Sequence, residues 1–299
     1  MASEFELIDL FKDIGSEYHL KNGIVVPSGD DCAVLESKKS IVTSVDSSIE
    51  SVHFPKDINP GEMAYRSIAV ALSDIAAMGC KPLGFSLSIS NLINEIDWYK
   101  DFANGVKEIS DEYEISLIGG DFVKGPLNIN VIVFGEPYQN KVLKRNGAKV
   151  GDIICISKPI GSAKKGLEEL KAGIKDSENI RNYLQPKPKF DLGRAIVEKA
   201  TSCIDTSDGL LTDLKHILEQ SNVGADIYLD TIPFTSSIED LNAGDDYDLC
   251  FTMSENDLEE NFYRIGKITE DKSINFISEK GYDVEINGYK HFKWVIFQI

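Results

Sequence analysis

Apolar residues recur at helix and strand spacings along most of the chain, and the two kinds of segment alternate. The predicted helices cover residues 5–15, 59–79, 96–112, a segment from about 163, a segment ending near 200, and 208–219. The predicted strands cover residues 40–45, 85–89, 115–118, 129–134, 152–157, 226–229 and 249–252. Such alternation is typical of α/β or α+β sheets covered by helices.

The clearest helix boundary lies at Asn59-Pro60. Asparagine is a favoured cap, and proline is tolerated at the first helical position. The apolar run that follows continues to Gly79, which is a suitable terminator. Asp74 therefore stands near the C-terminal end of an otherwise apolar helix, facing the negative pole of the helix dipole.

A chain of 299 residues is long for a single hydrophobic core, so two domains are expected. The segment 136–144 is polar and contains a proline, and we place the boundary there. The predicted domains are residues 1–138 and 139–299.

Composition narrows the class of protein further. Hydrophobic residues make up 42% of the chain, and no apolar run is long enough to span a membrane. The start at Met1 is acidic where a secretory signal would be basic, so a cytoplasmic location without membrane partners is expected. The formal net charge of −18 argues against nucleic acid as a partner, because phosphate backbones are held by lysine and arginine.

Five scattered cysteines argue against a disulfide framework and against a zinc site. They are Cys32, Cys80, Cys155, Cys203 and Cys250. We interpret them as free thiols, mostly buried.

Aspartates placed in turns after apolar runs carry the chemical signal. They are Asp30, Asp31, Asp46, Asp74, Asp121, Asp205, Asp208, Asp245 and Asp246. Charge avoids such positions unless something compensates it, and clustered carboxylates suit Mg²⁺ or Mn²⁺. Each position also has a simpler interpretation: Asp74 in solvent, Asp205 or Asp208 as a helix cap, and the others in ordinary turns.

Other phosphate-binding motifs are absent from the sequence. The segment 161–166 resembles a Walker loop, but Leu167 follows it where that loop needs serine or threonine. Neither a glycine-rich dinucleotide turn nor the protein-kinase motif set occurs. Arg145 could clamp a phosphate or be an ordinary exposed arginine, and His53 lies beside the predicted metal ligands.

Taken in order, seven motifs resemble those of the thiamine-monophosphate kinase family, within the aminoimidazole ribonucleotide synthetase-like superfamily. They are GDDCAV at 29–34, SVDSSIESVHF at 44–54, SDIAAMGCKP at 73–82, IGGD at 118–121, IDTSDGL at 204–210, GDDYDL at 244–249 and GYKHF at 288–292. The resemblance spans nearly the whole chain.

This resemblance implies an N-terminal metal- and ATP-binding domain whose sheet forms the interface of a homodimer, followed by a C-terminal α/β domain. It implies several Mg²⁺ ions, with ATP and thiamine monophosphate as the small-molecule partners. The implied metal ligands are Asp30, Ser44, Val45 (main chain), Asp46, Asp74, Asp121, Asp205 and Asp208. The implied ATP contacts are Gly120, Asp121, Arg145 and Ser207, and the implied substrate contacts are His53, Asp246 and Tyr289.

The activity implied is ATP-dependent phosphorylation of thiamine monophosphate to thiamine diphosphate, the last step of thiamine diphosphate biosynthesis. We expect direct in-line transfer bridged by metal at Asp46, Asp74 and Asp121, without a general base, because an acceptor phosphate needs none. Two alternatives stay open: an aminoimidazole ribonucleotide synthetase, and a non-enzymatic module that sequesters Mg-nucleotide or thiamine phosphates.

Overall fold

The computed structural model describes residues 4–289 and divides the chain into two compact units. The first unit comprises Met1–Val142 and Leu184–Glu198, and the second comprises Leu143–Tyr183 and Lys199–Ile299. Each unit is described by itself. The last three residues of the 288–292 motif lie outside the described residues.

The return of Leu184–Glu198 to the first unit was not expected from the sequence. Its anchor is Lys187, whose Nζ donates to the Glu112 carboxylate over 2.8 and 2.9 Å and to the Tyr65 hydroxyl over 2.7 Å. The Tyr65 hydroxyl in turn donates to Glu112 over 2.6 Å. Partners more than 70 positions apart in sequence therefore hold this segment in place.

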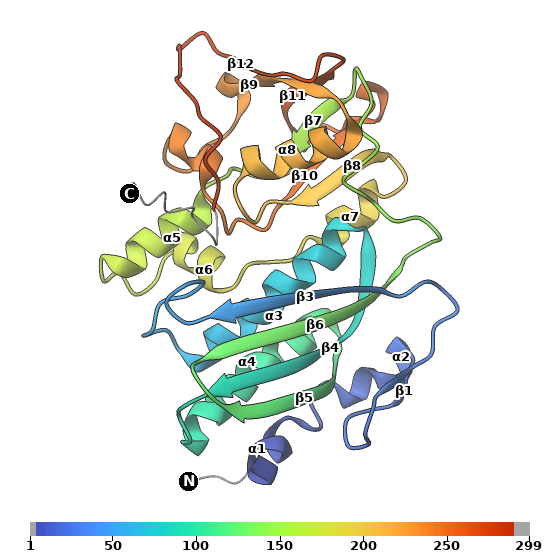
Figure 1. Cartoon of the computed structure of the whole chain (residues 1–299), viewed down its shortest axis with the longest axis vertical. Helices are drawn as coiled ribbons and strands as arrows, with labels where there is room; N and C mark the ends of the chain where they lie inside the picture. The colour runs from blue at the N-terminus through green and yellow to red at the C-terminus, as the bar shows by residue number, and fades with distance from the viewer. Residues whose placement is uncertain (1–3, 290–299) are drawn as a thin grey trace, which may run out of the picture. The chain divides into compact units, whose positions relative to one another are not determined.

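The first unit is built around a four-stranded sheet with the strand order β3-β6-β4-β5. Its elements are α1 (Glu4–Phe11), α2 (His19–Asn22), β1 (Ile24–Val26), β2 (Val34–Leu35), β3 (Val42–Ile49), α3 (Pro60–Ala77), β4 (Cys80–Asn91), α4 (Ile96–Tyr113), β5 (Ser116–Lys124), β6 (Asn128–Pro137) and α7 (Phe190–Ile196). Strands β4 and β5 are parallel, and the other two pairings are antiparallel. Figure 1 looks onto the open face of this sheet, with α3 and α4 behind it. The core lies between these helices and the sheet.

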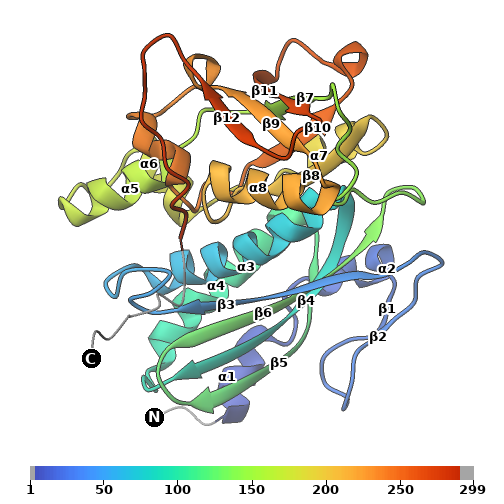
Figure 2. The same cartoon turned by 45° about the horizontal axis from the view of Figure 1, so that its top comes forward.

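The second unit contains a six-stranded sheet with the strand order β12-β9-β11-β7-β10-β8. Its elements are β7 (Ile153–Ile156), α5 (Ser162–Lys171), α6 (Glu178–Leu184), β8 (Ala200–Asp205), α8 (Leu210–Ser221), β9 (Gly224–Tyr228), β10 (Leu249–Met253), β11 (Tyr263–Thr269) and β12 (Ile274–Ile277). Helix α8 lies along one face of the sheet, visible in Figure 2, and its leucines join the core of this unit.

Three element boundaries correct the sequence-based prediction. Strand β3 continues to Ile49, so Asp46 lies inside a strand rather than at its end. Strand β5 continues to Lys124, so Asp121 also lies inside a strand. Helix α8 begins only at Leu210, because Gly209 at its N-cap has φ 110°, and Asp208 therefore belongs to the preceding turn.

Candidate active site

Strand β3 and helix α3 bring together three of the predicted metal ligands. Ser44 and Asp46 are two residues apart on β3, so their side chains share the face that packs on α3. Asp74 lies in the last turns of α3 and accepts a hydrogen bond from Ser44 Oγ over 2.5 Å. This contact joins segments thirty residues apart and establishes one candidate site.

The charges at this site oppose each other. Burial, and then the negative charge of Asp74, raise the pKa of Asp46 to about 6. Two carboxylates in partly dry surroundings repel, and a cation between them relieves that repulsion. Two carboxylates and a hydroxyl are also hard oxygen donors of the kind that Mg²⁺ prefers. The donor set thus fits the metal that the sequence implies.

The sheet register separates Asp46 from the Gly120-Asp121 motif. Asp46 pairs with Val131 of β6, Val131 with Leu87 of β4, and Leu87 with Gly120 of β5. Asp46 and Gly120 therefore share one row but stand on the two edge strands, three strand spacings apart, or roughly 14 Å.

Asp121 also faces the other side of the sheet. The next residue, Phe122, packs its ring against Phe11 at 5.1 Å between centroids and contacts Tyr99, on the helix side. Because successive side chains alternate, Asp121 points to the open face, where it is exposed beside its ladder partner Ser88.

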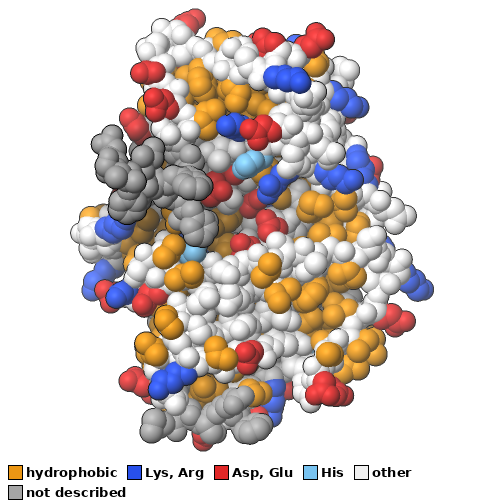
Figure 3. All heavy atoms as spheres, viewed as in Figure 1, with side chains coloured by type: hydrophobic (Ala, Val, Ile, Leu, Met, Phe, Trp, Pro, Cys, Tyr) orange, Lys and Arg blue, Asp and Glu red, His pale blue; other side chains and the backbone are white. Residues whose placement is uncertain are grey.

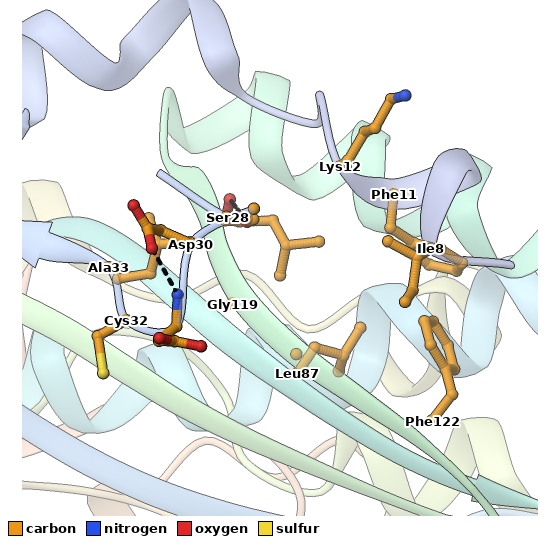
Figure 4. A pocket seen from close by; sticks show the side chains of 15 residues that line it. Ile8, Phe11, Lys12, Ser28, Asp30, Cys32, Ala33, Leu87, Gly119 and Phe122 are labelled. Carbon is orange, nitrogen blue, oxygen red and sulfur yellow. Dashed lines mark hydrogen bonds between the residues drawn. The ribbon is translucent and has the colours of Figure 1, made fainter. Parts of the chain in front are cut away.

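A cavity of about 580 Å³ lies within the first unit beside β5. Figure 4 shows Asp30 and Cys32 on a loop at one side, across from the rings of Phe11 and Phe122. Gly120 contributes to the same lining. The cavity has an apolar wall and an acidic rim, which suits a ligand with a flat ring and a charged end.

The loop that carries Asp30 is held loosely. Ser28 Oγ donates to the carbonyl oxygen of Leu117 over 3.4 Å, and the Asp31 amide donates to Asp30 Oδ1 over 3.0 Å. Asp30 remains exposed.

His53 follows β3 in a short turn. Its Nδ1 accepts a hydrogen bond from the Ile49 amide over 2.9 Å, so the ring proton belongs on Nε2. Val45, whose main chain is an implied metal ligand, stands in register with Ile132, and its side chain is 63% exposed on the open face.

In the second unit, the predicted Asp205, Ser207 and Asp208 surround the start of α8. Asp205 ends β8 and is 4% exposed. Asp213, which the sequence analysis overlooked, is buried in the first turn of α8 and accepts a hydrogen bond from the Asp208 amide over 3.1 Å. Burial, followed by the charges of Asp205 and Asp208, raises the pKa of Asp213 to about 8. An acid between the leucines of α8 was the available sequence signal.

The remaining predicted residues are spread over the second unit. The Tyr289 amide donates to the Asp208 carbonyl oxygen over 3.1 Å, which places Tyr289 beside this turn. Asp246 is buried, and its carboxylate accepts from the amides of Gly161 and Ala163, at the start of α5, over 2.5 and 3.2 Å. Arg145 is exposed, and its carbonyl oxygen accepts from Ser221 Oγ over 3.3 Å.

Within residues 4–289, no group of three His, Cys, Asp or Glu side chains is arranged to hold a metal ion. The predicted ligands are instead divided between the β3–α3 site, the loop and strand around the cavity, and the start of α8. The same described residues contain no helix long and apolar enough to cross a bilayer.

Comparison with known proteins places this arrangement in a class. Residues 29–136 match the N-terminal domain of AIR synthase related proteins, and residues 149–279 match the C-terminal domain. The mixed α/β fold in two units is therefore that of an AIR synthase related protein, as expected.

Relatives that match over nearly the whole chain identify the family within this class. A thiamine-monophosphate kinase of Buchnera aphidicola subsp. Schizaphis graminum is 35% identical, and the match covers 97% of this chain and 99% of that protein. The crystal structure of thiamine-monophosphate kinase from Stenotrophomonas maltophilia K279a matches with a TM-score of 0.81 at 31% identity, covering 92% of this chain and 96% of that one. A structure described as AaThiL complexed with AMPPCP and TMP matches with a TM-score of 0.79 at 28% identity, over 97% of both chains. The chain belongs to the thiamine-monophosphate kinase family.

Proposed function

We propose that this chain transfers the γ-phosphoryl group of ATP to the phosphate of thiamine monophosphate, giving thiamine diphosphate and ADP. The observation that carries the proposal is the match to thiamine-monophosphate kinase over 97% of this chain and 99% of the relative. Because thiamine diphosphate is the product, this reaction is the last step of thiamine diphosphate biosynthesis.

Charge makes cations necessary for such a reaction. Donor and acceptor phosphates are both anionic, and the chain itself carries a formal net charge of −18. Bound Mg²⁺ supplies charge neutralisation and alignment of the phosphates. The role of the chain's own residues is to hold several such ions in the proposed ligand set: Asp30, Ser44, Val45, Asp46, Asp74, Asp121, Asp205 and Asp208.

Direct in-line transfer requires no general base, because a phosphate oxygen is already a competent nucleophile at neutral pH. The raised pKa of Asp46 therefore need not indicate proton transfer. Burial, and then the negative charge of Asp74, explain the raised pKa, and a metal-binding role for both carboxylates accounts for their being placed so close together.

The nucleotide is assigned to Gly120, Asp121, Arg145 and Ser207. The cavity that Gly120 and Asp30 line has the apolar wall and acidic rim that a metal-coated nucleotide would need. Glycine is required at position 120 by the sheet itself, because a Cβ there would lie 2.6 Å from the carbonyl oxygen of Leu87 on the neighbouring strand.

Thiamine monophosphate is assigned to His53, Asp246 and Tyr289. Nδ1 of His53 accepts a hydrogen bond from the Ile49 amide, which fixes the orientation of the ring that we assign to the substrate phosphate. Asp246 already accepts from the amides of Gly161 and Ala163, so its part is to fix the start of α5 beside the thiamine rings.

We also propose that the chain forms a homodimer through the open face of its four-stranded sheet. One protomer holds Asp46 and Asp121 at opposite edges and on opposite faces of its sheet, further apart than one metal ion can bridge. If two sheets associate through their open faces, Asp121 of one protomer comes to lie on the partner's sheet, and it could reach ions held by the partner's Asp46, which faces the helices, only around the edge strand β3. Val45, Ile132 and Val123 are 63%, 41% and 50% exposed on that face, and Figure 3 shows hydrophobic side chains among the polar ones over the sheet.

The test is ADP release from ATP and Mg²⁺ with thiamine monophosphate, beside samples with free thiamine and with formylglycinamidine ribonucleotide. We expect ADP only with thiamine monophosphate, matched by thiamine diphosphate. Turnover only with the purine precursor would assign the chain to aminoimidazole ribonucleotide synthesis. Binding of both ligands without ADP would make it a sequestering module.

A further inference from the structure

The turn from Asp205 to Gly209 is held from two directions. On one side, the Asp245 amide donates to the Ser207 carbonyl oxygen and the Tyr247 amide donates to the Thr206 carbonyl oxygen, each over 2.9 Å. On the other side lies α8, whose N-cap Gly209 provides no side-chain cap. A turn with glycine at its end would otherwise be free to adopt several conformations.

Asp208 is fixed at both of its own peptide groups. Its amide donates to Asp213 Oδ2 over 3.1 Å, and its carbonyl oxygen accepts from the Tyr289 amide over 3.1 Å. The orientation of an aspartate carboxylate follows its backbone, because only two side-chain torsions separate them. Whatever holds the Asp208 amide therefore also directs the Asp208 carboxylate.

Asp213 is unusual for a residue with no predicted contact to substrate or metal. Its side chain is 2% exposed, in the first turn of α8, and it reaches back past the helix start to the amide five residues earlier. A buried carboxylate is costly unless a specific contact requires it. Leucine would satisfy the packing of α8 at this position, but it could not accept the hydrogen bond.

We propose that Asp213 is a positioning residue, whose acceptor oxygen holds the Asp208 amide so that Asp208 and Ser207 are directed at the metal-nucleotide complex. This inference rests on the proposed function for its activity readout. It can also be tested without turnover, because it predicts that loss of the Asp213 acceptor oxygen weakens metal binding.

Three variants separate positioning from simple stability. Asp213→Asn keeps an acceptor oxygen and removes the charge, whereas Asp213→Ala removes the acceptor. Asp152→Ala is the matched control, because Asp152 is a buried acid of the same unit that accepts from the Lys149 amide and Thr201 Oγ1, away from this turn. All three are compared by thermal unfolding before any other measurement.

The direct readout is Mn²⁺ binding to the full-length protein, titrated by electron paramagnetic resonance, together with the Mg²⁺ concentration that gives half-maximal turnover. We expect Asp213→Ala to weaken both by about tenfold, the effect of losing one buried hydrogen bond. Asp213→Asn should stay within about threefold of wild type, and Asp152→Ala should change stability alone.

Wild-type metal affinity in folded Asp213→Ala would overturn the proposal. So would a tenfold loss in Asp213→Asn, which decides the question if the alanine variant does not fold. Absence of turnover in the wild-type protein would contradict the proposed function instead, and Mn²⁺ binding would still test Asp213.

Discussion

Asp46 and Gly120 occupy one row of the four-stranded sheet, but they stand on its two edge strands with Val131 and Leu87 between them. The row fixes their separation at three strand spacings, and alternation turns Asp121 to the opposite face. Side-chain rotation cannot close such a gap. Within one protomer the two groups can serve only different ions, and we propose that they act on the same ions because a second copy of the chain supplies one of them.

Mixing two inactive variants tests this division. We expect Asp46→Asn and Asp121→Asn each to abolish turnover, because each removes a ligand from every site. Random reassociation would make half of the dimers mixed, and each mixed dimer would contain one intact site of two. Activity should return to about a quarter of wild type, measured as ADP release after subunit exchange.

The control is a mixture of Asp46→Asn with Asp74→Asn. Both residues belong to the β3–α3 site of one protomer, so every site in a mixed dimer lacks one of them. We expect no recovery from this pair. Recovery in both mixtures, or in neither despite demonstrated exchange, would contradict a site shared between protomers.

The open face of the sheet should determine the oligomeric state. Ile132 is 41% exposed in β6, and Ile132→Asp would place a charge at the centre of the proposed interface. We expect dissociation to monomers and loss of turnover at the same protein concentration, measured by sedimentation velocity. Ile174→Asp is the control, because Ile174 is similarly exposed, at 46%, but lies after α5 in the second unit. Dimers that persist in Ile132→Asp would exclude this face.

Asp46 should make the metal-free protein more stable in mild acid. Its pKa of about 6 in the folded state exceeds the ordinary value of 3.8, so the folded protein binds a proton that the unfolded chain does not. Stability from this group is complete below about pH 4 and is lost as the pH rises through 6. The expected change is on the order of 1–2 kcal/mol, allowing for partial exposure.

Chemical unfolding in EDTA between pH 4 and 7 measures this contribution. Asp46→Asn should remove this part of the dependence, leaving the part due to the raised pKa of Asp213, and should be more stable than wild type near pH 7, although it is inactive. Added Mg²⁺ should stabilise wild type more than the variant. An unchanged pH slope in Asp46→Asn would assign the dependence to other groups.

Local signals were sufficient for part of this architecture. Helix α3 begins at Pro60 behind the cap Asn59, whose side chain accepts from Gly61, because capping depends on neighbouring residues only. The separation of Asp46 from Asp121 depends on strand order, which no local pattern contains. The same holds for the return of Leu184–Glu198, which depends on Lys187 meeting Glu112 across 75 positions. Asp213 was overlooked because its partner is a backbone amide.

Cys32 offers a chemical probe of the cavity beside β5. It is the exposed member of the five cysteines, all of which lie in the described part of the chain, and it lines the cavity together with Asp30 and Gly120. Burial raises the pKa of Cys80 to about 11 and that of Cys155 to about 12, so these thiols should resist modification. One thiol per chain should therefore react rapidly with Ellman's reagent in the native protein, and none in Cys32→Ser.

If ATP occupies this cavity, Mg-ATP should slow the reaction at least severalfold, whereas free thiamine should not. A reaction rate unaffected by saturating Mg-ATP would place the nucleotide elsewhere.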